Sequence, residues 1–247
     1  MSELKQIALV TGSGRGIGKE IAKALAESGY FVYLNCDKAI DELNETAKEL
    51  CKKSGDCCMA LACDVSKSDE VRRMFSVIRK NHAGVDVLVN NAGISHYGLL
   101  GDMTDEEWNH IIGINLTSAF NCCKEAIPYM VSKKSGRILN ISSVWGNVGA
   151  SCEVAYSASK SGLNGLTRAL AKELAPSGIA VNAAALGVID TQMNSHLDPQ
   201  EKAALTESIP AGRFATAKEA AEMCVNILKM PIYMTGQVIT MDGGWMA

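Results

Sequence analysis

Apolar residues along this chain form short runs that alternate with longer stretches of helical periodicity. Each run is bounded by turn residues, which is typical of a buried strand. Runs of this kind predict strands at 7–10, 31–35, 59–63, 85–90, 136–142, 179–184 and 237–241. The stretches between them repeat apolar residues every three or four positions, as on one face of a helix. They predict helices at 17–28, 40–53, 68–82, 104–131, 153–175 and 216–229.

Strict alternation of strands and helices indicates parallel strands joined by crossovers. The predicted fold class is therefore α/β: a single-domain Rossmann-like, doubly wound fold with a parallel sheet of about seven strands and helices on both faces. Capping boxes at Thr104-Asp-Glu-Glu107 and Thr216-Ala-Lys-Glu219 mark two of the helix starts. No linker, repeat or low-complexity tract divides the chain, so one domain is expected over residues 1–247.

Composition narrows the function classes. A hydrophobic content of 47% and a charged content of 21% are ordinary for a soluble globular protein. The net charge of −3 gives no basic field, so nucleic acid is not an expected partner. No apolar run approaches the roughly 18 residues of a membrane span, and the first residues do not resemble a signal peptide. A cytosolic location is expected.

Cysteine usage gives no disulfide framework or metal motif. The chain has nine cysteines, an odd number, and no C-x-x-C pair, and its four histidines lack the spacing of metal ligands. Most of these cysteines are interpreted as small core residues in a reducing compartment. No metal site is expected.

A glycine-rich turn, Thr11-Gly-Ser-Gly-Arg-Gly-Ile-Gly18, follows the first predicted strand. A strand, a turn and a helix bring backbone N–H groups and the positive helix end to one point, which suits a pyrophosphate. The Walker pattern fails, because Ser13 replaces its first glycine and Glu20 its Ser/Thr. The turn indicates a dinucleotide site, with a plain strand-to-helix turn as the alternative.

Tyr156 and Lys160 are the most informative pair in the chain. Residues four apart project from the same face of a helix. An ammonium beside a phenol favours the ionised phenol and lowers its pKa from about 10, which suits proton exchange with a carbonyl or alcohol. Taken alone, a surface pair is the alternative. Ser143 and the segment Asn90-Asn-Ala-Gly93 follow predicted strands, where α/β sheets bind ligands.

With these residues in view, the chain resembles the short-chain dehydrogenase/reductase family over essentially its whole length. Within that family it is most similar to the 3-oxoacyl-[acyl-carrier-protein] reductases. The segments that support the resemblance are Thr11-Gly-x-x-x-Gly-Ile-Gly18, Asp64-Val65, Asn90-Asn-Ala-Gly93, Asn115, Ser143, Tyr156-x-x-x-Lys160, Val181-Asn182 and Thr191.

The resemblance implies a catalytic set of Asn115, Ser143, Tyr156 and Lys160. Tyr156 would donate a proton to the carbonyl oxygen, and Ser143 would polarise that carbonyl. Lys160 would hold the nicotinamide ribose, and Asn115 would link Lys160 through water to solvent. The residues expected to bind the cofactor are Gly12, Ser13, Gly14, Arg15, Gly16, Ile17, Gly18, Cys36, Asp37, Lys38, Asp64, Val65, Asn91, Ala92, Gly93, Tyr156, Lys160, Gly187, Ile189 and Thr191.

Cofactor choice depends on the end of the second predicted strand. An acidic residue there would hold the adenosine ribose diol of NADH and repel a 2′-phosphate. Counting from Gly29 places Cys36 at that position, although a shift of one residue would place Asp37 there. Arg15 and Lys38 would pair with a 2′-phosphate through charge-assisted bonds. NADPH is the predicted cofactor, and NADH is the alternative.

Substrate identity is less constrained. The substrate is expected to contact Ser143, Trp145, Glu153, Tyr156 and Met193. A lid is expected over 190–212, with Met193, His196 and Leu197 as lining residues. An acidic acyl-carrier protein would dock on basic residues, for which Lys133, Lys134 and Arg137 are the candidates.

The leading prediction is an oxidoreductase, acting on a CH–OH group, that reduces a 3-oxoacyl thioester in fatty acid synthesis. The alternatives are a reductase or dehydrogenase for a small ketone, a sugar or polyol, or a hydroxysteroid, and a non-catalytic nucleotide-binding regulator. The resemblance also implies a homotetramer, in which the helices predicted at 104–131 and 153–175 pack across a dimer interface and the carboxyl-terminal segment makes a second contact.

Overall fold

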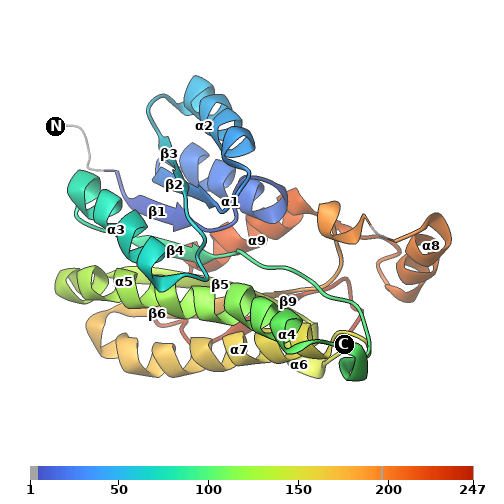
Figure 1. Ribbon diagram of the computed structural model, residues 1–247. Helices are drawn as coiled ribbons and strands as arrows, with labels where there is room; N and C mark the ends of the chain where they lie inside the picture. Colours follow the sequence, from blue (N-terminus) through green and yellow to red (C-terminus); the bar gives the residue numbers. More distant parts are fainter. Residues whose placement is uncertain (1–4, 196, 247) are drawn as a thin grey trace.

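Seven parallel strands form the central sheet of the computed structural model, which describes residues 5–195 and 197–246. Their order is β3-β2-β1-β4-β5-β6-β9, so the winding direction reverses between β1 and β4 (Figure 1). The strands are β1 (Ile7–Val10), β2 (Phe31–Cys36), β3 (Cys58–Ala62), β4 (Val87–Asn90), β5 (Gly136–Ser143), β6 (Ile179–Leu186) and β9 (Val238–Met241). The predicted doubly wound fold is confirmed.

Helices cover both faces of this sheet (Figure 1). One face packs against α1 (Gly16–Glu27), α2 (Ile40–Ser54) and α9 (Ala217–Lys229). The opposite face packs against α3 (Ser68–His82), α5 (Ser118–Lys133) and α7 (Val154–Leu174). Among the described residues, no helix is both long enough and apolar enough to cross a membrane.

The first strand shows why its sequence is apolar throughout. Ala8 and Val10 lie in the core under α1, whereas Ile7 and Leu9 lie in the core under α3. Successive side chains of a strand point to opposite faces, and here both faces are covered, so every position is buried.

The structure differs from the predicted elements in one helix and several short segments. The helix expected over 104–131 is interrupted: α4 (Asp105–Ile112) continues through a π-helical turn, η2 (Gly113–Thr117), into α5. Sequence periodicity also missed α6 (Trp145–Val148), α8 (Pro199–Ser208) and a two-stranded pair, β7 (Ile189–Asp190) with β8 (Ala215–Thr216). The described residues also include three 3₁₀ turns: η1 (Leu100–Asp102), η3 (Ala175–Ser177) and η4 (Gln192–Asn194).

Candidate active site

The glycine-rich turn lies between β1 and α1, at the carboxyl edge of the sheet beside the reversal point. Gly12 has a φ of +62°, and a Cβ there would lie 2.9 Å from the Ala92 Cα, so only glycine fits. A Cβ on Gly18 would lie 2.4 Å from both the Gly12 carbonyl oxygen and the Asn91 Nδ2. The first turn of α1 is therefore pressed against the loop itself.

Asn91 fixes this loop from the neighbouring strand. Its side-chain amide donates to the carbonyls of Thr11 (2.8 Å) and Gly12 (3.0 Å). The Thr11 hydroxyl in turn accepts from the backbone N–H groups of Asn91 and Ala92, both at 3.0 Å. The predicted cofactor residues Asn91 and Ala92 thus hold the shape of the turn.

The amino end of α1 is suited to an anion. Arg15 is its N-cap residue, and no side chain caps the helix. The first turn contains no acidic residue, whereas the first turns of α2, α3, α4, α8 and α9 each contain at least one. Uncapped N–H groups and the helix dipole favour a phosphate here, so the structure fits a dinucleotide.

The other predicted turn residues differ in exposure. Arg15 is exposed, and Gly14, Gly16 and Ile17 are partly exposed. Ser13 is fully buried, and its hydroxyl accepts from the backbone N–H of Asn35 at 2.9 Å. The side chain of Ser13 therefore ties the turn to β2.

The residues predicted to distinguish NADPH from NADH lie at the end of β2, which Ser13 ties to this turn. Cys36 is partly exposed, and Asp37 and Lys38 are exposed. Burial raises the pKa of the Cys36 thiol, and the Asp37 carboxylate raises it further. A neutral thiol thus occupies the last position of the strand, with one acidic and one basic side chain after it.

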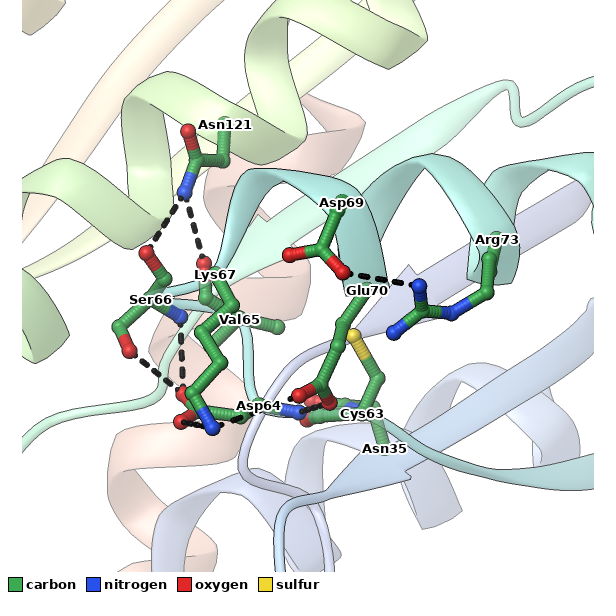
Figure 2. A network of polar contacts seen from close by, with 10 residues as sticks. All are labelled: Asn35, Cys63, Asp64, Val65, Ser66, Lys67, Asp69, Glu70, Arg73 and Asn121. Carbon is green, nitrogen blue, oxygen red and sulfur yellow. Dashed lines mark hydrogen bonds and ion pairs between the residues drawn. The ribbon is translucent and has the colours of Figure 1, made fainter.

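The Asp64 carboxylate already has partners within the protein (Figure 2). It accepts from the Ser66 backbone N–H (3.0 Å) and hydroxyl (2.6 Å) and pairs with Lys67 at 3.4 Å. Burial opposes its ionisation, but these bonds outweigh burial and lower its pKa. The next residue, Val65, is buried, and its carbonyl accepts from Asn121 at 3.0 Å. Asp64 remains partly exposed and ionised, so it can still accept a further hydrogen bond.

Ser143, Tyr156 and Lys160 come together beyond the end of β5. Lys160 is buried, its Nζ lies 5.6 Å from the centroid of the Tyr156 ring, and it donates to the Ile141 carbonyl at 2.8 Å. The Ser143 hydroxyl accepts from the Trp145 backbone N–H at 3.2 Å. It also makes a hydrogen bond with the Tyr156 phenol. The fold thus gathers the three residues that the sequence singled out.

The protonation of this group differs from the sequence-based expectation. Desolvation raises the pKa of Tyr156 to about 12, although the Ser143 hydroxyl acts in the opposite direction. Desolvation also lowers the pKa of Lys160 to about 8. The prediction that Lys160 lowers the phenol pKa is therefore wrong for the polypeptide alone, because burial dominates. At neutral pH the phenol keeps its proton.

Asn115 lies in the π-helical turn η2 and is buried. Its amide donates to the Ile94 carbonyl (2.9 Å) and the Ser159 hydroxyl (3.0 Å), and its Oδ1 accepts from the Ile94 N–H (2.8 Å). A Cβ on Gly93 would lie 3.4 Å from both the Asn115 Oδ1 and the Lys160 Nζ, so these two atoms flank the same glycine.

Ser159 is a site residue that sequence reasoning missed. It is fully buried, accepts from Asn115, and donates to the Tyr156 carbonyl at 2.7 Å. It therefore joins the helix of Tyr156 to the π-helical turn. Its position in the sequence, between Tyr156 and Lys160, could have indicated that it belongs to the site.

The remaining predicted cofactor residues, and Met193, lie in the segment that follows β6. Thr191 approaches the glycine turn, where a Cβ on Gly16 would be 3.7 Å from its Cγ2. Gly187 lies against Asp242, and Ile189 is buried in β7. Met193 is exposed in η4.

Trp145 makes a contact that its sequence position did not suggest. Its ring centroid lies 4.8 Å from that of Trp245, at an interplanar angle of 58°. The carboxyl-terminal segment therefore packs beside the strand end that holds Ser143. Glu153, three residues before Tyr156, raises the pKa of the phenol through its negative charge, after the larger effect of desolvation.

Among the described residues, the predicted lid-lining residues and the predicted basic docking residues lie in different parts of the molecule. His196 falls outside the described residues, and Leu197 is partly buried. The prediction that Lys133, Lys134 and Arg137 lie at the mouth of the site is wrong. Lys133 and Lys134 end α5 and Arg137 lies at the start of β5, whereas Ser143 lies at the end of that strand. Eight residues of strand at about 3.3 Å each separate the two ends. There Lys133 pairs with Asp86, and Arg137 donates to the Met230 carbonyl at 2.8 Å.

Comparison with known proteins agrees with this geometry. Residues 6–202 match the family model of the short chain dehydrogenases. The chain is 39% identical over 243 residues to the 3-oxoacyl-[acyl-carrier-protein] reductase FabG of Staphylococcus aureus, covering 98% of each chain. It is 37% identical over 243 residues to the uncharacterized oxidoreductase YmfI of Bacillus subtilis, covering 98% of this chain and 99% of that one.

This chain belongs to the short-chain dehydrogenase/reductase family. Its structure is also similar to the crystal structure of a "putative gluconate dehydrogenase" from Agrobacterium tumefaciens. That comparison gives a TM-score of 0.92 at 33% identity, covering 97% of this chain and 95% of the other. The protein is thus an oxidoreductase of this family with an NAD(P) cofactor, and the relatives differ in the substrates that their names state.

Proposed function

We propose that this protein is a cytosolic, NADPH-dependent reductase that converts a 3-oxoacyl thioester, carried by acyl-carrier protein in fatty acid synthesis, to the 3-hydroxyacyl form. The main support is that Ser143, Tyr156 and Lys160 gather at the end of β5, while the uncapped end of α1 lies at the same carboxyl edge of the sheet. Support for the substrate comes from the 39% identity to a 3-oxoacyl-[acyl-carrier-protein] reductase over 98% of each chain.

The side chains suit the reduction of a carbonyl. A phenol whose pKa is about 12 holds its proton at neutral pH and can donate it to the carbonyl oxygen as negative charge develops. Ser143 can donate a hydrogen bond to the same oxygen. Lys160, whose pKa is about 8, can return a proton to the phenol. When bound, the nicotinamide would supply the hydride.

Support for NADPH comes from the end of β2 and the glycine turn. Cys36 gives this strand end no carboxylate of its own, while Arg15 and Lys38 are exposed cations beside the turn. Guanidinium and ammonium groups favour a 2′-phosphate. Asp37 is also exposed, which keeps NADH as the alternative.

A second candidate function is the oxidation or reduction of a polyol, sugar acid or small ketone. The similarity to the structure named as a gluconate dehydrogenase favours it, as do two polar or bulky residues near the phenol, Glu153 and Trp145. The basic residues predicted to dock an acyl-carrier protein lie at the other end of β5 from Ser143, which weakens the support for that partner.

A substrate panel separates the two candidates. The purified protein is assayed in the reductive direction with NADPH and either acetoacetyl-CoA or a small ketone. It is assayed in the oxidative direction with NADP⁺ and gluconate, a polyol or a hydroxysteroid. We expect the highest kcat/KM for the 3-oxoacyl thioester, by at least about tenfold, which corresponds to roughly 1.4 kcal/mol in transition-state binding. A higher value for gluconate or a polyol would replace the proposal with the second candidate.

A further inference from the structure

Three cysteine sulfurs gather at the edge of the sheet opposite the active site. Cys51 lies in the last turns of α2, while Cys57 and Cys58 stand at the start of β3, which runs alongside α2 (Figure 1). Their Sγ atoms all lie within 4.8 Å of one another, and those of Cys51 and Cys58 are 3.5 Å apart. Among the described residues, this is the one cluster with metal-ligand geometry.

The spacing of the sulfurs suits a metal ion. Thiolates bind Zn²⁺ at about 2.3 Å in a tetrahedron, which places neighbouring sulfurs roughly 3.8 Å apart. The Cys51–Cys58 separation of 3.5 Å is close to this value, and the other two separations do not exceed 4.8 Å. A disulfide would use only two of the three sulfurs, whereas a metal ion uses all three.

Burial divides the cluster into a shielded part and an open part. Cys57 is 1% exposed and Cys58 is 8% exposed, while Cys51 keeps intermediate exposure. Two sulfurs therefore lie away from water, and the third borders solvent. This arrangement leaves an entry path for an ion and room for a water molecule as a fourth ligand.

The surroundings show how charge would be managed. The Lys5 ammonium donates to the Asp56 carbonyl at 2.9 Å, next to the cluster. Three adjacent thiolates would need more positive charge than one lysine supplies, and a divalent ion bound between them would provide it.

We propose that Cys51, Cys57 and Cys58 form a three-thiolate binding site for a thiophilic divalent metal ion of the Zn²⁺ or Cd²⁺ type. Binding would form three metal–sulfur bonds and release three thiol protons, with water as the fourth ligand. No electron transfer is involved. The bound ion would join the end of α2 to β3, the outermost strand of the sheet.

Cadmium titration of the full-length protein tests the site. The protein is reduced, freed of metal with a chelator, and titrated with Cd²⁺ while thiolate-to-cadmium charge-transfer absorbance is followed. We expect saturation at one ion per chain, proton release that accompanies binding, and competition by Zn²⁺. No saturable absorbance, or saturation unrelated to chain concentration, would overturn the proposal.

Matched serine variants locate the ligands. Cys51→Ser changes the partly exposed ligand, and we expect Cd²⁺ affinity to fall by roughly 100-fold, since even changes outside the ligand shell cost about 10–100-fold. Cys152→Ser, at another partly exposed cysteine, should leave the affinity unchanged. Cys58→Ser provides a second ligand variant, and circular dichroism verifies the fold of each. Equal affinity in Cys51→Ser and wild type would overturn the proposal. A Cys51–Cys58 disulfide that resists treatment with a reductant would also overturn it.

Discussion

At the scale of single residues, the Tyr156 hydroxyl is the group with the most specific expected role. Tyr156→Phe removes the proton donor and leaves the ring, so we expect kcat to fall by about 10²–10⁴-fold. NADPH affinity, measured by fluorescence titration, should stay within about twofold. The control is Tyr233→Phe, at a tyrosine that is 97% exposed. Undiminished turnover in Tyr156→Phe would remove the phenol from the mechanism.

Burial of the Lys160 ammonium should lower the stability of the folded protein. The pKa of Lys160 in the folded protein is about 8, below the ordinary 10.5. Burial of the ammonium therefore reduces the free energy of unfolding most below pH 8, where the side chain is charged in both states. The cost fades as pH rises from 8 toward 10.5. We expect Lys160→Met to be inactive yet more stable to urea at pH 7, by up to about 3 kcal/mol, with a gain about 1 kcal/mol smaller at pH 9.

The comparison for this effect is Lys172→Met, at an exposed lysine of the same helix. That variant should show no pH-dependent gain in stability between pH 7 and pH 9. A Lys160→Met variant that is less stable than wild type at pH 7 would mean that the ammonium bond to the Ile141 carbonyl outweighs desolvation.

Arg15 should set the preference for NADPH. Arg15→Gln removes an exposed guanidinium beside the glycine turn, and we expect kcat/KM with NADPH to fall about tenfold, because charge-assisted hydrogen bonds contribute roughly 1.5–3 kcal/mol. The value with NADH should change by less than about twofold. Lys19→Gln is the matched control, because that lysine pairs with Glu49 at 3.0 Å. Equal losses with both cofactors would assign Arg15 a general role.

At the scale of elements, the glycine turn and α1 are in close contact at Gly18 but not at Gly14. Substitution of these two glycines should therefore affect stability differently, although they look alike in the sequence. In Gly18→Ala the new Cβ would meet backbone at 2.4 Å, so we expect a loss of about 1–3 kcal/mol in unfolding free energy and weaker NADPH binding. In Gly14→Ala the nearest atom is the Leu43 Cδ1 at 3.8 Å, and stability should barely change. Urea denaturation of both variants makes the comparison, and a Gly18→Ala protein as stable as wild type would contradict it.

Elements with strong local signals were predictable from the sequence. Both predicted capping boxes form, with Thr104 accepting from Glu107 and Thr216 from Glu219. The interruption at Gly113–Thr117 was not predictable, because an apolar helical period continues through it and the π-helical turn adds only one residue. The helix α8 has almost no amphipathic pattern and no buried residue, so periodicity could not reveal it, although Asp198 caps it.

Site residues show the same division between local and distant signals. The gathering of Tyr156, Lys160 and Ser143 followed from the order of strands and helices. The inward orientation of Ser13 and the contact between Trp145 and Trp245 depend on tertiary packing, which spacing along the chain does not encode. Burial of the Tyr156 phenol also depends on tertiary packing. For this reason the predicted shift of its pKa was in the wrong direction.

At the scale of the whole molecule, we propose that the protein assembles as a homotetramer, with one contact through α4, α5 and α7 and a second through the carboxyl-terminal segment. On α5, Phe120 is 49% exposed and Val131 is 40% exposed, and before β9 Tyr233 is 97% exposed. Such apolar exposure is typical of subunit contacts. Light scattering after gel filtration should give four chains for wild type and fewer for Phe120→Glu. Val77→Glu, at a similarly exposed residue of α3, is the control. A wild-type monomer would end this proposal.

The contact between Trp145 and Trp245 has a practical consequence for anyone who makes this protein. The last described residues lie against the strand end of Ser143, and Asp242 lies against Gly187. A purification tag fused to the carboxyl-terminal segment would follow closely after Trp245, near the strand end of Ser143. Its interference would then be mistaken for an intrinsic loss of turnover. Strand β1 begins at the opposite edge of the sheet, so an amino-terminal, cleavable tag is the safer design.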